Sequence, residues 1–366
     1  MSEDSTGGRT GGRAASRRRR KPKRRAVRIV AWTAAGVVVL GGAGLGYFYV
    51  KFNGNLKSVD IDAALGKDRP QNIDNGSMDI LVLGSDSRSG ANGEYGQDDG
   101  GSARSDTAMI VHLYEGHKSA SIVSIPRDTL VTRPACQMPN GKTNPGGPRQ
   151  MFNESFTIGG AACAVKTVEK MSGIRMDHYI EVDFTGFKKI VDRLGGVEVT
   201  TSKPIKDSGS HLDLPAGTHR LNGEQSLGLV RTRKSIGDGS DLGRIQVQQA
   251  FIKALIKQVK GIGLFDDPKR LLDLADTSTK AITTDSKLGD VKSLMGFAAG
   301  LQGIDSSNMH MITLPVGADR IDPDRVAPLQ KETQLVWDAL LKDQPVPAAA
   351  TEKSAGDKGD TGSLVR

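Results

Sequence analysis

Residues 78–88 read MDILVLGSDSR, and residues 104–128 read RSDTAMIVHLYEGHKSASIVSIPRD. These stretches contain three short apolar runs, at 79–84, 107–114 and 120–125, and such runs bounded by turn residues are typical of buried strands. Each run begins or ends in a charged turn, and together these turns contribute Asp86, Arg88, Arg104, Asp106, Arg127 and Asp128. Acidic and basic side chains at the edge of one buried sheet suit a metal ion together with a phosphate group.

Further elements alternate along the chain. We expect additional strands at 178–183, 197–200 and 309–314, and helices where apolar residues recur at helical spacing, at 161–172, 185–194, 244–260, 269–276 and 288–301. Strands that are apolar throughout belong to sheets covered on both faces. The predicted fold class is therefore α/β, with a mixed central sheet flanked by helices on both faces.

The charge of the chain is concentrated near its start. The protein has 366 residues and a net charge of +8, and residues 17–25 alone carry eight positive charges. The remainder is close to neutral, which argues against a basic body that binds nucleic acid. Residues 29–50 contain no charge and exceed the roughly 20 residues that a membrane-spanning helix needs.

A cleaved signal peptide is the alternative for residues 29–50. Its apolar region would be shorter, about 7–15 residues, and a cleavage site of small residues would follow. Here Tyr47, Phe48 and Tyr49 follow instead. We expect one uncleaved transmembrane helix, with the basic arm in the cytoplasm by the positive-inside rule. The predicted order is a disordered cytoplasmic arm (1–28), the transmembrane helix (29–50), a stalk (51–77), an extracellular domain (78–342) and a disordered tail (343–366).

Two cysteines, Cys136 and Cys163, lie in the predicted extracellular part. In an oxidising compartment they can form a disulfide, and two free buried thiols are the alternative. The sequence has no Cys-x-x-Cys pair, so a zinc or redox role is not indicated.

The first candidate site consists of carboxylates. Asp86 follows one predicted strand and Asp106 enters the next, so the two approach each other if these strands are neighbours. Two carboxylates that face one hard cation describe a magnesium site. The alternative is that each aspartate only caps a turn, and the arginines two residues away, Arg88 and Arg104, favour the site.

Arginines supply the second candidate site. Arg127 closes a predicted strand and can bind phosphate with Asp128 beside it, and a surface ion pair is the alternative. Arg231 and Arg233 alternate, so in an extended segment both would point to one side. Arginines bind phosphate oxygens through paired hydrogen bonds.

A helix face carries the third set. Asp241, Arg244 and Gln248 are spaced three and four residues apart, so on a helix they share one face. The face lies at a helix start, where an anion is favoured. A solvated helix face is the alternative, but it does not explain this set beside an Arg-x-Arg. Common hydrolase marks are missing, since the sequence has neither Gly-x-Ser-x-Gly nor His-Glu-x-x-His.

Several motifs occur together in one order. They are ILVLGSDSR (80–88), RSDTAMIV (104–111), VSIPRDTLV (123–131), HYIEVDFTGFKKIVDRLGGVEV (178–199), LNGEQSLGLVRTRK (221–234) and DLGRIQVQQ (241–249). In this order, after a predicted membrane anchor, they resemble the LytR–CpsA–Psr family of cell-envelope proteins. One departure is Val247, which stands where an arginine is frequent in that family.

The resemblance implies a magnesium-dependent phosphotransferase outside the membrane. Such enzymes transfer a glycopolymer from a polyprenyl-pyrophosphate carrier to a peptidoglycan hydroxyl through a phosphodiester, and a pyrophosphatase side activity is compatible with this chemistry. By motif, the metal ligands would be Asp86 and Asp106, and the catalytic residues Arg88, Asp106, Arg127 and Asp241. The pyrophosphate-binding residues would be Arg88, Arg104, Arg127, Arg231, Arg233, Arg244 and Gln248.

Two other functions remain open at this stage. One is a regulatory protein of the transcriptional-attenuator type, whose basic arm would contact nucleic acid. We do not expect nucleic acid as a partner, because a basic cluster beside a membrane span is better explained by topology and anionic lipid. The other is a protein that binds polyprenyl phosphate without turnover.

Overall fold

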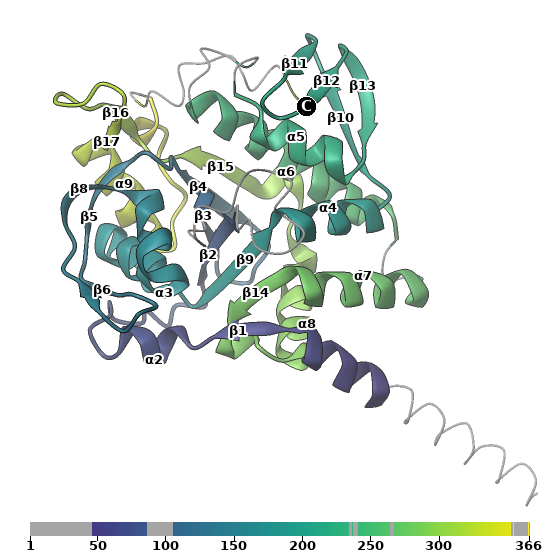
Figure 1. Cartoon of the computed structure of the whole chain (residues 1–366), viewed down its shortest axis with the longest axis horizontal. Coiled ribbons are helices and arrows are strands. Elements are labelled where there is room, and N and C mark those ends of the chain that lie inside the picture. The colour runs from purple at the N-terminus through teal and green to yellow at the C-terminus, as the bar shows by residue number, and fades with distance from the viewer. Residues whose placement is uncertain are drawn as a thin grey trace, which may run out of the picture. The chain divides into compact units, whose positions relative to one another are not determined.

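The computed structural model describes residues 46–85, 105–233, 236, 241–263, 267–352, 354 and 365. The chain divides into a unit at Met1–Val50 and a larger unit at Lys51–Arg366. The larger unit is built on a seven-stranded sheet with the order β1-β14-β9-β2-β3-β4-β15 (Figure 1). Antiparallel and parallel pairs both occur, so the sheet is mixed, as the sequence predicted.

The central sheet consists of β1 (Lys57–Val59), β14 (Ile282–Asp285), β9 (His178–Asp183), β2 (Met78–Ser85), β3 (Ser105–Leu113), β4 (Ala120–Ile125) and β15 (Met309–Thr313). The two-stranded ribbons are formed by β5 (Leu130–Arg133) with β8 (Gly147–Met151), β6 (Cys136–Gln137) with β7 (Thr143–Asn144), β10 (Val197–Thr201) with β13 (Gly217–Leu221), β11 (Ile205–Asp207) with β12 (Leu212–Leu214), and β16 (Val316–Ala318) with β17 (Val326–Pro328). The α-helices are α2 (Ile61–Leu65), α3 (Phe152–Ser172), α4 (Phe184–Arg193), α5 (Gly223–Arg231), α6 (Asp241–Gly261), α7 (Pro268–Ala281), α8 (Val291–Gly300) and α9 (Gln330–Leu341).

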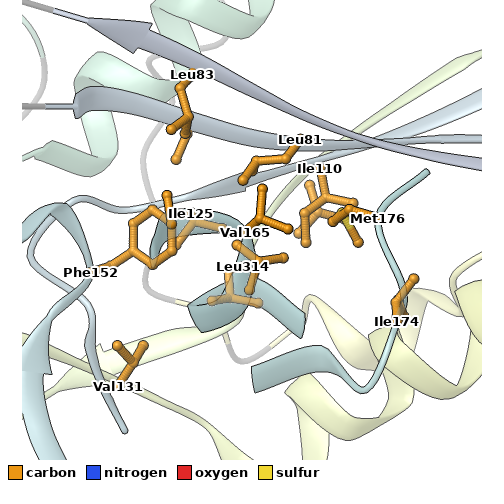
Figure 2. Close-up of a cluster of buried hydrophobic side chains, with 14 of the residues drawn as sticks. Leu81, Leu83, Ile110, Ile125, Val131, Phe152, Val165, Ile174, Met176 and Leu314 are labelled. Atoms are coloured by element: carbon orange, nitrogen blue, oxygen red, sulfur yellow. The ribbon is translucent and has the colours of Figure 1, made fainter. Parts of the chain in front are cut away.

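One face of the sheet packs tightly against α3 and α9. Alternate residues of the strands point to this face, since side chains in a strand alternate between the two faces of a sheet. Leu81, Ile110 and Ile125 meet Val165 of α3 in a closed apolar cluster (Figure 2). Trp337 of α9 belongs to the same cluster. The exposed fraction of each of these side chains is 2% or less. This cluster is the main rigid core of the domain.

The opposite face is covered by α6 and α8, so helices lie on both faces, as predicted. Ile80 and Ile122 point to this side and pack near Ile252 of α6 and Phe297 of α8. Among the described residues, this cluster has six buried members and ten that are only partly buried. The first face has 25 buried and six partly buried members, so a larger share of the apolar side chains on the second face is exposed to solvent.

A second apolar cluster, at the side of the sheet, positions α5. The ribbons β10–β13 and β11–β12 share an apolar cluster with α5 and α6, in which Val247 and Phe251 are buried. The start of α5 lies close to α4, because a Cβ at Gly223 would be 2.3 Å from the carbonyl oxygen of Lys188. The Gly223 N–H also donates to Asp192 at 2.7 Å. Only glycine permits this approach, which fixes where the start of α5 lies.

The folded domain extends beyond the bounds expected from the sequence. The predicted stalk contains β1, which pairs with β14, and α2, whose Ile61 and Leu65 belong to the main core. In the predicted tail, Asp343 accepts a hydrogen bond from Glu115, and Ala350 is fully buried. No helix in the described part of the chain is both long enough and apolar enough to cross a membrane. The predicted span at 29–50 lies almost entirely outside those residues.

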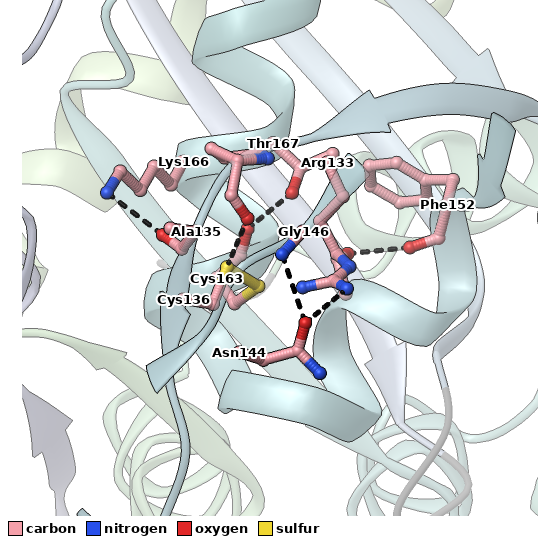
Figure 3. The surroundings of a disulfide bond; sticks show 11 residues. Arg133, Ala135, Cys136, Asn144, Gly146, Phe152, Cys163, Lys166 and Thr167 are labelled. Carbon is pink, nitrogen blue, oxygen red and sulfur yellow. Dashed lines mark hydrogen bonds between the residues drawn. A yellow bond between two sulfur atoms is a disulfide. The ribbon is translucent and has the colours of Figure 1, made fainter. Parts of the chain in front are cut away.

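A disulfide joins Cys136 of β6 to Cys163 of α3 across 27 residues of sequence (Figure 3). Of the two possibilities for these cysteines, the structure therefore contains the bonded one. Arg133 is buried beside this link and donates to Asn144 at 2.7 Å. The link holds the β6–β7 ribbon against the helix that covers the tight face of the sheet.

Candidate functional site

One edge of the sheet brings the candidate residues together. The strands β2, β4 and β9 end at this edge, and β3, which is antiparallel to β2 and β4, begins there. Ser85 at the end of β2 pairs with Ser105 at the start of β3. Asp86, Arg88 and Arg104 adjoin these two residues in sequence but lie outside the described residues. Asp106 and Arg127 are described, and both lie at this edge.

Arg127 is the centre of an ion-pair cluster. Its Nη1 donates to Asp106 Oδ1 at 2.8 Å, and its Nε lies 3.6 Å from Asp241 Oδ1 and 3.5 Å from Asp128 Oδ2. The backbone N–H of Arg127 also approaches Asp241 Oδ2 at 3.4 Å. The predicted contact between Arg127 and Asp128 is therefore present, but Asp106 and Asp241 are the further partners that direct this guanidinium toward the sheet edge.

Arg244 lies on α6, one turn after Asp241, and its side chain is almost completely buried. It forms an ion pair with Asp241, and its Nη2 donates to the carbonyl oxygen of Asp106 at 2.9 Å. Burial lowers the pKa of the Arg244 guanidinium, and the nearby Arg233 and Arg127 lower it further. An anion bound here would favour the charged form, because it offsets both effects.

Asp106 is ionised at neutral pH. Burial alone would raise the pKa of this carboxyl, but the positive charges of Arg244, Arg127 and Arg233 outweigh that effect and keep the pKa below its usual value. Both ion pairs of Asp106, with Arg127 and with Arg233 at 3.9 Å, use Oδ1. Its Oδ2 has no such partner among the described residues and is the oxygen that could bind a metal ion.

The segment with Arg231 and Arg233 differs from the prediction. We expected an extended segment for both arginines, but Arg231 is the last residue of α5, and only Arg233 of the two lies beyond the helix. Both arginines nevertheless line the same cavity. Arg231 lies over the ring of Phe184, with 4.8 Å from its Cζ to the ring centroid. The N–H of Arg233 donates to Asp207 Oδ2 at 2.9 Å.

The cavity between these elements has a volume of about 310 Å³. Of the predicted residues, Asp106, Arg231, Arg233, Arg244 and Gln248 line it. Gln248 is held in place by two hydrogen bonds, since its Nε2 donates to Thr107 Oγ1 at 3.1 Å and to the carbonyl oxygen of Val230 at 3.0 Å.

Three buried polar atoms of this cluster have no hydrogen-bond partner among the described residues. They are Arg127 Nε, Asp241 Oδ1 and Arg244 Nε, out of eight such side-chain atoms in the described part of the chain. Arg127 Nε and Asp241 Oδ1 take part in ion pairs but make no hydrogen bond of normal geometry. Buried polar groups without a hydrogen bond are rare in folded proteins because each one costs free energy. Their concentration here is typical of a binding site whose ligand completes the hydrogen bonds.

Some residues of the site were not predicted from the sequence. Phe184 and Thr107 line the cavity beside motif residues, and Asp207 reaches it from the β11–β12 ribbon. Phe184 directly follows β9, and its place at a strand end was a usable signal. For Asp207 no local pattern in the sequence indicates the role.

Of the two predicted metal ligands, the described residues include one, Asp106. Asp106 is ionised and presents Oδ2, which fits a magnesium ligand, whereas Asp86 is outside the described residues. Among the described residues, no cluster of three or more carboxylate, histidine or cysteine side chains could bind a metal by itself. Asp106 would therefore need Asp86, water or phosphate oxygens to complete the coordination.

An α/β domain with arginines and an ionised aspartate around a cavity at its sheet edge has the features of a protein that binds a phosphate ester. Residues 48–341 match the model of the LytR_cpsA_psr family. The chain therefore belongs to the LytR–CpsA–Psr family, as its motifs indicated.

Curated relatives agree with this assignment. The chain is 33% identical over 297 residues to the polyisoprenyl-teichoic acid–peptidoglycan teichoic acid transferase TagT of Bacillus subtilis, covering 77% of this chain and 84% of that protein. It is 31% identical over 309 residues to the cell wall biosynthesis protein LcpA of Corynebacterium glutamicum, covering 76% of this chain. That match spans only 58% of the length of LcpA.

Solved structures are similar in fold. TagT bound to LI-WTA has a TM-score of 0.56 and 26% identity, over 79% of this chain and 98% of that one. The LytR-Csp2A-Psr enzyme from Actinomyces oris has a TM-score of 0.58 over 78% and 96% of the two chains. Its 23% identity supports the fold alone.

Proposed function

We propose that this protein is a membrane-anchored phosphotransferase that moves a glycopolymer from a polyprenyl-pyrophosphate carrier to peptidoglycan. The observation that carries the proposal is the cavity lined by Asp106, Arg231, Arg233 and Arg244, with Arg127 in an ion pair with Asp106. TagT, a relative at 33% identity, is named a teichoic acid transferase acting between a polyisoprenyl carrier and peptidoglycan. The two findings point to the same chemistry.

The reaction is a displacement at phosphorus. The oxygen of the acceptor hydroxyl forms a bond to the phosphorus next to the glycan, and the bond from that phosphorus to polyprenyl phosphate breaks. The leaving group retains the bridging oxygen and gains negative charge. Guanidinium groups that are already in place stabilise this charge without moving, which is the main requirement of phosphoryl transfer.

Within this proposal the described residues have separate roles. Arg231 and Arg233 line the open cavity and bind the pyrophosphate. Arg244 also lines the cavity, and its buried guanidinium contributes further positive charge there. Asp106 or Asp241 accepts the proton of the acceptor hydroxyl. Arg88 and Arg104 would complete the set of cations from the segment outside the described residues.

Magnesium would be bound by Asp106 together with Asp86. When bound, the ion would neutralise charge on the phosphate oxygens. The Oδ2 atom of Asp106 supports this role, because its ion pairs with described residues use only Oδ1.

The less completely buried face of the sheet suits the lipid. Its ten partly buried apolar side chains, among them Val82, Met109 and Ile252, lie between the sheet and the helices α6 and α8. A polyprenyl tail entering here would bury apolar surface at about 25 cal/mol per Å². In this arrangement the domain lies outside the cell and is anchored by residues 29–50, as the sequence predicted.

The test uses the full chain in detergent, with a polyprenyl-pyrophosphate-linked glycan, peptidoglycan fragments and magnesium. We expect a phosphodiester-linked product that disappears when the metal is chelated, and loss of transfer in Arg231→Ala. The matched control is Arg220→Ala, which removes a similar charge from the exposed ribbon β13. Hydrolysis to polyprenyl phosphate without attachment would indicate the pyrophosphatase activity. Tight lipid binding without any turnover would refute the transferase.

A further inference from the structure

A second cavity lies on the other side of α6 from the candidate site. It has a volume of about 370 Å³ and runs between α6, strand β15 and the segment 345–348. Consecutive residues of α6 divide the two cavities, since Gln248 lines the site and Gln249 lines this groove. The proposed function makes no use of the groove.

The groove exposes the backbone of an edge strand. Among the described residues, β15 is the last strand of the sheet and pairs only with β4 (Figure 1). The N–H of Leu314 donates to the carbonyl oxygen of Ser124, so alternation along the strand turns the backbone groups of Met311 and Thr313 outward. No described residue bonds to those outward N–H and C=O groups. An open edge of this kind can accept an extended peptide as a further strand.

The opposite wall cannot close this edge by itself. It contains Pro345 and Pro347, which have no backbone N–H to donate to a ladder. None of the fourteen described residues that line the groove is acidic, while Lys253 and His310 are basic. Lys253 is exposed and forms no ion pair with another described residue. The groove therefore suits an extended peptide that carries carboxylates.

The groove adjoins the strand that leads to the site. Gln249 donates to Ser124 Oγ at 3.2 Å and lies 3.4 Å from Thr313 Oγ1, which ties α6 to β4 and β15 at the same level. Arg127 lies three residues after Ser124, just beyond the end of β4. A peptide in the groove would thus have one end near the phosphate-binding arginines.

From this geometry we infer that the groove binds the stem peptide of the peptidoglycan acceptor, through the backbone of β15 and the charge of Lys253. The inference rests on the proposed function, since that function supplies the acceptor. Stem peptides are short chains with free carboxylates, attached to the sugar whose hydroxyl would react. The groove would select acceptor strands that still carry peptides and orient their sugar toward Arg127.

Binding is measured separately from turnover. Full-length protein in detergent is titrated with a fluorescent, uncrosslinked glycan strand, either intact or stripped of its peptides by an amidase. We expect the stripped strand to bind about tenfold more weakly, which corresponds to one or two lost hydrogen bonds and a charge pair. Equal binding of both strands would overturn the inference.

Matched variants locate the binding. Lys253→Glu should weaken binding of the intact strand about tenfold, whereas Lys257→Glu, on the same helix but outside the groove, should change it less than twofold. Met311→Pro removes one outward N–H, and Met311→Ala, which loses the same side chain, is its control. Equal effects within either pair would contradict the role of the groove.

The donor reaction separates this inference from the proposed function. At saturating acceptor, the rate of polyprenyl phosphate release should be unchanged in Lys253→Glu, with only the acceptor KM raised. If the wild type binds the intact strand preferentially but never turns over the donor, the transferase proposal fails and the groove remains. A concentration-dependent dimer that Met311→Pro abolishes would instead assign the edge to a second copy of the chain. A preference for the intact strand that appears only after removal of residues 355–366 would assign the edge to the tail.

Discussion

Asp207 is expected to control pyrophosphate affinity although it need not touch the ligand. Its side chain is buried at 4% exposure, and its two oxygens accept hydrogen bonds from the N–H groups of Arg233 and Gly209, both at 2.9 Å. Asp207→Ala removes both acceptors, and each such bond to a charged group contributes about 1.5–3 kcal/mol. The loss should release the backbone that orients the Arg233 side chain.

The upper limit of the effect follows from the contact that depends on it. Asp207 acts through Arg233, so the loss of affinity cannot exceed the contribution of that guanidinium, about 1.5–3 kcal/mol for a charge-assisted bond. We therefore expect Asp207→Ala to weaken binding of a short-chain prenyl pyrophosphate by about ten- to hundredfold. Asp207→Asn retains one acceptor and should be intermediate.

A double-mutant cycle tests this reasoning. Calorimetric titration of the full chain in detergent gives the dissociation constants of wild type, Asp207→Ala, Arg233→Ala and the double variant, and thermal unfolding checks that each is folded. Asp207→Ala should have almost no effect when Arg233 is already absent. Additive losses in the double variant would refute the indirect role, and an unchanged affinity in the single variant would refute the contact.

Three further predictions concern stability. Arg69→Met leaves Glu169 buried without its partner and should lower the free energy of unfolding by about 3–5 kcal/mol, whereas also changing Glu169 to Met should recover most of it in denaturant titrations. His112 lies between Asp79 and Asp343, and although burial lowers the pKa of its imidazole, these carboxylates outweigh that effect and raise the pKa above the usual 6.5. The free energy of unfolding should therefore fall as the pH rises from 6.5 through this pKa. This slope should disappear in a His112→Asn variant. Reduction of the Cys136–Cys163 bond should cost about 3.5 kcal/mol on the chain-entropy model, with unchanged stability in reductant as the contrary result.

The sequence predicted most reliably what depends on neighbouring residues. The bounds expected for the strands at 120–125 and 178–183 agree with β4 and β9. Asp241 and Arg244 lie on one face of α6 with Gln248, because spacings of three and four residues have the same consequence on any helix. The central strands were recognisable because both faces of the sheet are covered, which leaves continuous apolar runs.

What depends on distant residues could not be predicted in the same way. Strand β1 has only three residues, all exposed, and it is a strand because β14 offers an open edge. Arg231 was expected in an extended segment, but an Asn222–Gln225 capping box starts a helix that continues through it. The contact between Asp207 and Arg233 joins two elements 26 residues apart, so nothing local indicates it.

The departure at Val247 shows how the position of a helix decides which residues reach the ligand. The family resemblance implies an arginine at this position, where this chain has valine. In this chain Val247 is fully buried in the apolar cluster that α6 shares with β10 and β13, whereas its neighbour Gln248 lines the cavity. An arginine at this position would place an unpaired charge in an apolar core, which costs several kcal/mol. Valine is therefore the residue that packing requires here, and the positive charge of the site comes from Arg127, Arg231, Arg233 and Arg244 instead.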